Sequence, residues 1–163
     1  MAKLGDMIDY LKKNSVRYEV IEHAPAFTAH EAAIASHVPD KDLAKTLIVQ
    51  TDDKYCMVVM PADHRLDEHL LGKTIKAKQL HLAQEEDLKP LFPDCELGAM
   101  PPFGNLYALP VYIDKSLMND DEIVFNACSH TKSIRLKMND YMGLVKPIIA
   151  EFSRSRFEID EPK

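Results

Sequence analysis

Apolar residues at the start of the chain recur with the spacing of an amphipathic helix. They occupy positions i, i+3, i+4 and i+7 of one stretch: Leu4, Met7, Ile8 and Leu11. This spacing places them on one face of a helix, and the lysines that follow supply the positive charge that a helix C-terminus favours. A second helix should begin after Thr28, because Thr28 and Glu31 have the spacing of a capping box. We therefore expect helices over about 4–13 and 29–37.

Runs of alternating or continuous apolar residues, mostly bounded by turn residues, predict the strands. We expect them at 16–20, 43–50, 55–60, 76–82, 109–114, 122–126 and 133–137. Thr51-Asp52-Asp53 separates the second strand from the third and has the composition of a tight turn. Such strand-turn-strand steps imply antiparallel pairing, although helices are interleaved with the strands. The pattern therefore predicts a single α+β domain with a mixed sheet rather than a doubly wound one.

Capping and breaking residues predict the remaining elements. We expect further helices at 67–72, 84–91 and about 139–149. Pro147 lies inside the last of these and should kink or split it. The polar residues after Phe152 predict a frayed tail. The chain is accordingly divided into a domain over 1–152 and a C-terminal tail over 153–163.

Composition and charge narrow the class of protein. A chain of 163 residues with 46% hydrophobic and 28% charged residues is one ordinary globular domain, which excludes a disordered chain. Its net charge of -6 excludes a globally basic surface, so a nucleic-acid partner must be held by a local patch. The charged N-terminus is unlike a signal peptide, and no run is long enough to span a membrane. We therefore expect a cytoplasmic protein that binds neither DNA nor a membrane.

The cysteines and histidines show no spacing that indicates a metal site. Cys56, Cys95 and Cys128 are an odd number without a C-x-x-C pair, which predicts reduced thiols. No two histidines have the i, i+4 spacing of a helical zinc site, so we expect no metal and no cofactor. Cys128 lies two residues before His130, and such a pair could form a nucleophile. The fold rather than the sequence usually brings such pairs together, so an inert Cys128 is favoured.

Lys45 is the first candidate for a functional residue. It lies in Leu43-Ala44-Lys45-Thr46-Leu47-Ile48-Val49, where alternation places Lys45 on the same face as Leu47 and Val49. A lysine on an apolar face is costly unless its charge has a function or a partner. Alternatively, Lys45 lies at the start of the strand and its ammonium extends to water.

The segment from Gly98 to Gly104 is the second candidate. It contains two glycines, which let a substrate approach the backbone, and two prolines, which hold the loop in shape. Such a loop can direct N–H groups at a developing oxyanion, although Pro101 and Pro102 have none. The alternative is a tight connection between a helix and a strand.

Two groups of basic residues complete the candidates. Each group is compatible with a solvated face or with contacts to phosphates. The groups are Lys73, Lys76 and Lys78, and Lys132, Arg135 and Lys137.

These motifs resemble the YbaK/EbsC group of aminoacyl-tRNA deacylases, relatives of the editing domain inserted in bacterial prolyl-tRNA synthetase. The resemblance extends from about Leu4 to Phe152. It rests on the segments His23-Ala24-Pro25, Lys45-Thr46-Leu47-Ile48-Val49, the G-x-x-x-P motif Gly98 to Pro102, Phe103-Gly104, and His130. Pro101 replaces an expected small polar residue and Cys128 an expected glycine, and both positions bear on amino-acid specificity. The resemblance implies the fold of the prolyl-tRNA synthetase-associated domain, with a largely antiparallel, barrel-like sheet and surrounding helices.

The resemblance also implies a function in translation fidelity. The protein would hydrolyse the ester between a wrong amino acid and the 3′ end of a tRNA, with the ribose hydroxyl of the substrate assisting. Its partners would be the acceptor end of aminoacyl-tRNA and, in some cases, an aminoacyl-tRNA synthetase. An alternative is a non-catalytic module that binds the aminoacyl or tRNA end and acts with a synthetase.

The site residues follow from the same resemblance. Lys45 would hold and polarise the aminoacyl group, N–H groups of the Gly98–Pro102 loop would contact the reacting centre, and His130 would line the pocket. The implied catalytic residues are Lys45, Gly98, Pro102 and His130. The implied substrate-binding residues are Phe27, Thr28, Ile34, Thr46, Ala99, Met100, Pro101, Phe103 and Gly104.

Overall fold

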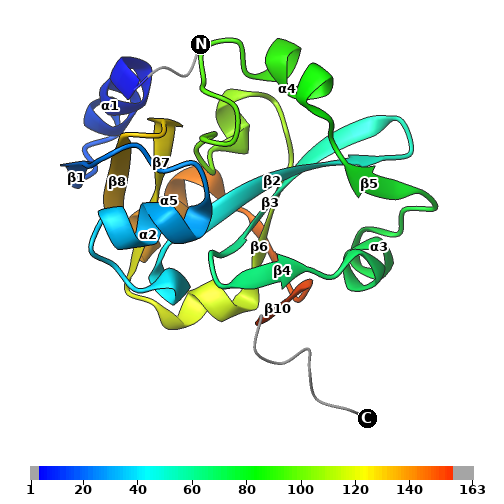
Figure 1. The fold of residues 1–163 in the computed structure, drawn as a ribbon. Helices are drawn as coiled ribbons and strands as arrows, with labels where there is room; N and C mark the ends of the chain where they lie inside the picture. The colour runs from blue at the N-terminus through cyan, green and yellow to red at the C-terminus, as the bar shows by residue number, and fades with distance from the viewer. Residues whose placement is uncertain (1–3, 156–163) are drawn as a thin grey trace.

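The structure is a computed structural model that describes residues 4–155. Its strands form a five-stranded sheet, a three-stranded sheet and a two-stranded sheet. The helices lie around these sheets, and strands from both halves of the chain meet in the middle of the molecule (Figure 1). This arrangement confirms the predicted α+β fold class.

The five-stranded sheet has the order β5-β2-β3-β6-β9 and carries the candidate lysine. Its strands are β2 (Ala44–Thr51), β3 (Lys54–Pro61), β5 (Leu80–Leu82), β6 (Val111–Asp114) and β9 (Ile148–Ala150). β2 pairs antiparallel with β3 and with β5, whereas β6 pairs parallel with β3 and with β9. The sheet is therefore mixed, as the strand-turn-strand pattern predicted.

Two smaller sheets flank this one. The antiparallel sheet β1-β8-β7 contains β1 (Tyr18–Glu22), β8 (Lys132–Lys137) and β7 (Glu122–Ser129). A single parallel bridge between Leu43 and Val124 links it to the residue before β2. The third sheet pairs β4 (His64–Leu66) with β10 (Ser153–Ser155).

Local sequence signals account for the helices. They are α1 (Leu4–Lys13), α2 (Ala29–Ala35), α3 (Glu68–Ile75), α4 (Glu85–Leu91) and α5 (Met138–Val145). The predicted capping box before α2 is present, because Thr28 and Glu31 each accept a hydrogen bond from the other's backbone N–H. No helix in residues 4–155 is long and apolar enough to cross a membrane.

The structure corrects two helix predictions. The helix expected over 139–149 ends at Val145, and Ile148–Ala150 forms β9 instead. Pro147 explains the break, since it lacks an N–H and disfavours a helical conformation for the residue before it. Gly72 was expected to end its helix but lies inside α3, which continues to a left-handed cap at Lys76.

Two strand predictions also need correction. The strand expected over 76–82 is confined to Leu80–Leu82. Ser153–Ser155 were expected to begin a frayed tail, but they pair with β4 as the strand β10. The backbone hydrogen bonds of this pairing hold the segment in a strand, although its polar sequence does not predict one. The rest of the expected tail, 156–163, lies outside the described residues.

β2 and β3 are covered on both faces, which fixes the direction of each side chain at the site. Ala44 and Ile48 of β2 belong to the main core cluster, which also contains Met100. Val49 belongs to a second cluster together with Leu71 of α3, and Leu47 and Ile75 pack against this cluster. Successive residues of β2 therefore point into different clusters.

Candidate functional site

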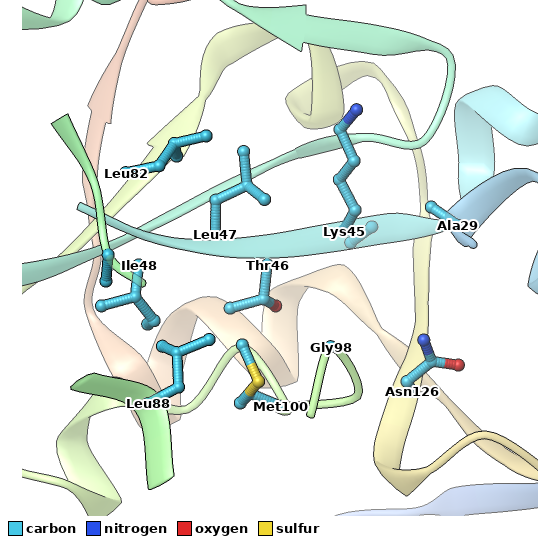
Figure 2. Close-up of a pocket in the computed structure, with 12 residues that line it drawn as sticks. Ala29, Lys45, Thr46, Leu47, Ile48, Leu82, Leu88, Gly98, Met100 and Asn126 are labelled. Atoms are coloured by element: carbon cyan, nitrogen blue, oxygen red, sulfur yellow. The ribbon is translucent and has the colours of Figure 1, made fainter. Parts of the chain in front are cut away.

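A cavity of about 230 Å³ lies along one edge of β2 (Figure 2). β5 pairs with β2 only at Val49, Gln50 and Thr51, so the preceding residues of β2 have no β5 partner. The walls of the cavity are mainly apolar, with a small number of polar groups, as is common for small-molecule sites. The lining residues are Ala29, Ala44, Lys45, Thr46, Leu47, Ile48, Leu82, Ala83, Leu88, Gly98, Met100 and Asn126.

Lys45 is on the face of β2 that the alternation predicted. Figure 2 shows Lys45 and Leu47 extending to one side of β2, while Thr46 and Ile48 extend toward Met100 on the other side. The Lys45 ammonium donates a hydrogen bond to the backbone carbonyl of His64, the first residue of β4. The half-buried charge therefore has a polar partner at the border of the cavity.

A chain of hydrogen bonds fixes the carbonyl that accepts from Lys45. His64 Nδ1 lies 2.8 Å from Ser153 Oγ, and the Ser153 N–H donates to Asp114 Oδ1 at 3.0 Å. Asp114 is buried, so the start of β4 at His64 is tied to the core. Sequence reasoning missed this support because its members are distant along the chain.

The Gly98–Gly104 loop contributes only part of its length to the cavity. Gly98 and Met100 line it, and Gly98 has a φ of +85°, a conformation that favours glycine. The loop is anchored on both sides: the Cys128 N–H donates to the Ala99 carbonyl at 2.8 Å, and Tyr141 Oη donates to the Pro102 carbonyl at 2.6 Å. The loop is therefore held in one shape rather than being a loose connection.

The other predicted loop residues lie in the core. Ala99, Pro101, Pro102, Phe103 and Gly104 are buried and are not among the residues that line the cavity. At Gly104 a Cβ would lie 2.5 Å from a Val111 methyl carbon, which explains why glycine is needed there. Their contribution to the site is to hold Gly98 and Met100 in place.

His130 lies behind Gly98 rather than on the cavity wall. Its ring nitrogens lie 3.0 Å and 2.8 Å from the carbonyl oxygens of Ala26 and Leu97, and the backbone N–H of His130 donates to Glu96 Oε2 at 2.7 Å. A Cβ added to Gly98 would lie 3.7 Å from His130 Cε1. The imidazole therefore ties the loop to the segment before α2.

The residues predicted around α2 lie outside the cavity. The Thr28 side chain is used in the capping box, and Phe27 packs against the His130 ring with centroids 4.9 Å apart. Phe27 and Ile34 are 71% and 62% exposed. From this segment, Ala29 lines the cavity.

Asn126 is a cavity residue that the sequence reasoning missed. Its Oδ1 is buried and has no hydrogen-bond partner among residues 4–155. β7 is otherwise apolar from Ile123 to Cys128, so a polar side chain in this run was the available signal. Because buried polar groups are normally satisfied, this amide marks a place where a ligand could complete the hydrogen bonding.

The expectation of three reduced thiols is wrong, because Cys95 and Cys128 form a disulfide. The two Cα atoms are 4.4 Å apart although 33 positions separate the residues in the sequence. Cys128 has a φ of 64° and lies where the pairing of β7 with β8 shifts register. A bulge of this kind redirects a side chain. The spacing of cysteines along the sequence does not predict such a bulge, so it could not predict the disulfide. Cys56 is the free cysteine of the described chain and is buried.

Comparisons with known proteins identify the family of the region that contains the cavity. Residues 23–144 match the family described as the aminoacyl-tRNA editing domain, and this span contains the whole cavity wall. The multifunctional Ser/Thr-tRNA deacylase ProXp-y of Escherichia coli (strain K12) is 31% identical over 104 residues, which are 63% of this chain and 62% of that protein. Proline--tRNA ligase of Geobacillus sp. (strain WCH70) is 26% identical over 90 residues, which are 55% of this chain and 16% of the ligase. The chain therefore matches less than two thirds of the length of either relative.

Solved structures show the same fold. A crystal structure described as a candidate trans-editing enzyme for prolyl tRNA synthetase superposes with a TM-score of 0.82, at 20% identity, over 93% of this chain and 97% of that one. The fold match thus covers 93% of the chain, and the family match covers residues 23–144. The chain belongs to the aminoacyl-tRNA editing domain family.

Proposed function

We propose that this protein is a trans-editing hydrolase that cleaves the ester bond of mischarged aminoacyl-tRNA. The observation that carries the proposal is the cavity along the unpaired edge of β2, which lies within the editing-domain match and borders both Lys45 and Gly98. The cavity holds a group the size of an amino acid and its ester linkage rather than a duplex. The substrate would therefore enter with its acceptor end.

The edge of β2 offers backbone groups to such a substrate. The Ile48 carbonyl points to this edge, because it accepts from the Ala83 N–H at 2.9 Å. Backbone groups of alternate residues point to the same edge of a strand. The N–H and carbonyl of Thr46 accordingly face the cavity beyond the end of the β5 pairing. They are suited to hydrogen-bond an aminoacyl group.

The charge and the loop would act on the reacting ester. Lys45 would supply a positive point charge close to the carbonyl that becomes an oxyanion. Gly98 would let the loop backbone approach the same group. Water would attack the ester carbon, the bond to the ribose oxygen would break, and the adjacent ribose hydroxyl would assist proton transfer. In this scheme the protein positions and stabilises, and needs neither a protein nucleophile nor a metal.

The nature of the amino acid can be narrowed by the polar groups in the cavity. The Asn126 amide and the Thr46 side chain could hydrogen-bond a hydroxyl group of the aminoacyl side chain. The relative named as a Ser/Thr-tRNA deacylase points to the same amino acids. A separate editing step is useful because one methylene in an apolar pocket is worth only about 1–3 kcal/mol to a synthetase. Seryl and threonyl esters are therefore the first substrates to test.

The experiment is a deacylation screen with purified protein and tRNA charged with Ala, Cys, Ser, Thr or Pro. We expect hydrolysis of at least one mischarged tRNA, with the seryl and threonyl esters fastest. Absence of hydrolysis together with tight binding of aminoacyl-tRNA would favour the alternative of a non-catalytic module that acts with a synthetase.

A second arm of the screen tests the mechanism. Replacing the terminal 2′-hydroxyl of a 3′-aminoacylated tRNA with hydrogen should slow hydrolysis strongly, whereas Cys128→Ala and chelators should leave the rate nearly unchanged. In the structure Cys128 is bonded to Cys95, and the His130 ring is held by backbone carbonyls. If the deoxy substrate reacts normally while Cys128→Ala is inactive, the substrate-assisted scheme is wrong.

A further inference from the structure

Three exposed lysines lie on α3 and on the segment that follows it. Lys73 is in the last turn of α3, Lys76 is its left-handed cap, and Lys78 follows two residues later. None of the three forms an ion pair with any residue in the part of the chain that the structure describes. Lys73 and Lys78 line a surface hollow together with His69 and one acidic residue, Glu68. We call Lys73, Lys76 and Lys78 the α3 patch.

The α3 patch is joined to the cavity by the short strand β5. The chain runs from Lys78 into β5, whose last residue, Leu82, lines the cavity. Even a fully extended chain of four residues spans only about 13 Å, so Lys78 lies within that distance of Leu82 along the backbone. α3 also packs on the face of β2 toward which Leu47 points, and the Lys45 side chain extends to that same side (Figure 2). A ligand that leaves the cavity on this side therefore meets the α3 patch.

The second basic group of the sequence is arranged differently. Arg135 forms an ion pair with Glu19 at 2.8 Å. It also borders a hollow that contains Asp120, Asp121 and Glu122. This group lies on β8, on the side of the molecule opposite α3 (Figure 1). Of the two groups, the α3 patch alone combines uncompensated charge with a position beside the cavity.

We propose that the α3 patch binds phosphates of the tRNA acceptor stem while the 3′ end occupies the cavity. This inference rests on the proposed function for the cavity, and it adds the surface that holds the rest of the substrate. A protein of net charge -6 repels RNA on average, so a local group of unpaired lysines is needed to hold it. Lysine binds phosphate as a point charge and without reading bases. The α3 patch should therefore add affinity without adding sequence preference.

The test compares two triple variants with equal loss of charge. In Lys73→Gln/Lys76→Gln/Lys78→Gln the α3 patch is neutralised. In the control, the exposed lysines of α1 and β8 on the far side are neutralised: Lys12→Gln, Lys13→Gln and Lys137→Gln. Circular dichroism establishes that both variants are folded.

Binding of uncharged tRNA is measured by fluorescence anisotropy between about 50 and 200 mM salt. For the α3 patch variant we expect affinity to fall about tenfold or more at the lower salt concentration. The slope of log K against log salt should become shallower by about 0.9 for each phosphate contact that is lost. The control should bind like the wild type. Arginine at all three patch positions should retain binding, since the charge is kept.

Kinetics give a second readout that a merely structural role would not produce. The α3 patch variant should show a raised KM for mischarged tRNA with kcat nearly unchanged, and normal hydrolysis of a short aminoacylated CCA fragment that lacks the stem. Equal loss of tRNA binding in both triple variants, or unchanged binding in the α3 patch variant, would overturn the inference. If the wild type hydrolyses no mischarged tRNA, the proposed function fails, and binding of uncharged tRNA still decides the role of the α3 patch.

Discussion

Replacement of Lys45 by methionine tests both the structural contact of the ammonium and its proposed role in catalysis. Its ammonium donates to the His64 carbonyl, and it also borders the cavity where the ester is proposed to bind. Methionine keeps an unbranched apolar stem beside Leu47 but removes the charge. The variant therefore tests the ammonium without opening a large void on this face of β2.

The expected magnitudes differ for stability and for rate. A hydrogen bond from a charged donor is worth about 1.5–3 kcal/mol, and the more favourable burial of methionine offsets part of that loss. The melting temperature should fall by about 2–4 °C for each kcal/mol lost in a domain of this size. Loss of one preorganised electrostatic group at a developing oxyanion costs about 10²–10³ in rate, or about 2.7–4 kcal/mol. The rate should thus fall steeply at temperatures where the variant is still fully folded.

The assay is single-turnover hydrolysis of a mischarged tRNA well below the melting temperature. Ser153→Ala is the matched control, since it removes the hydroxyl that holds the His64 ring and leaves Lys45 in place. We expect Lys45→Met to lose at least about a hundredfold in rate and Ser153→Ala to lose little. A folded Lys45→Met protein with a rate within about threefold of the wild type would refute the catalytic role, because a lost transition-state contact costs far more.

Three further predictions concern the loop and its surroundings. Tyr141→Phe removes the donor to the buried Pro102 carbonyl, so the free energy of unfolding should fall by about 1–3 kcal/mol; an unchanged urea midpoint would contradict this. Gly98→Val should cost about 1–2 kcal/mol of stability, because a φ of +85° disfavours side chains, and should reduce turnover more; normal turnover would show that the loop only connects. Burial and neighbouring Asp42 raise the pKa of Asp120 to about 6, above its ordinary value of 3.8. Above pH 6 the folded protein therefore holds an unfavourable ionised carboxylate, which lowers the free energy of unfolding. Asp120→Asn should therefore be more stable than the wild type near pH 8, as measured by urea unfolding, and the difference should vanish as the pH falls through 6 toward 4.

Features encoded by neighbouring residues were predictable. The hairpin of β2 and β3 is confirmed because its apolar runs are separated by Asp52 and Asp53, which favour a tight turn. The capping box at Thr28 is likewise a property of four consecutive residues. In both cases the physical signal lies within the element itself.

Features that depend on distant partners were not predictable in the same way. The strand Ser153–Ser155 has no apolar alternation and exists through its pairing with β4. The bond between Cys95 and Cys128 depends on how a loop packs against a bulged strand. The spacing of the isoleucines after Pro147 predicted that the helix would continue past this proline. The helix ends before Pro147 instead, because proline disfavours a helical conformation for the residue that precedes it.

The candidate site shows the same division. Alternation placed Lys45 on the face of Leu47, and the structure confirms that face. Alternation could not say which loop covers each face, so it did not reveal that Gly98 and Met100 lie on the other side of β2. Asn126 reaches the cavity from a strand of another sheet. Such a residue is brought to the site only by the packing of the two sheets.

The short β5 is what makes a site at this edge possible. If β5 continued to pair with β2 beyond Val49, its backbone would satisfy the Thr46 N–H and carbonyl and would occupy the edge that borders the cavity. Lys45 and Gly98 lie on opposite sides of β2, so an ester that contacts both must cross this edge at Thr46. The chain turns away after Leu82 into α4, which leaves the edge open. β5 also leads from the α3 patch to the cavity, because Leu80 borders the hollow beside the patch and Leu82 lines the cavity. One short strand therefore both ends the pairing with β2 and links the two surfaces proposed to bind tRNA.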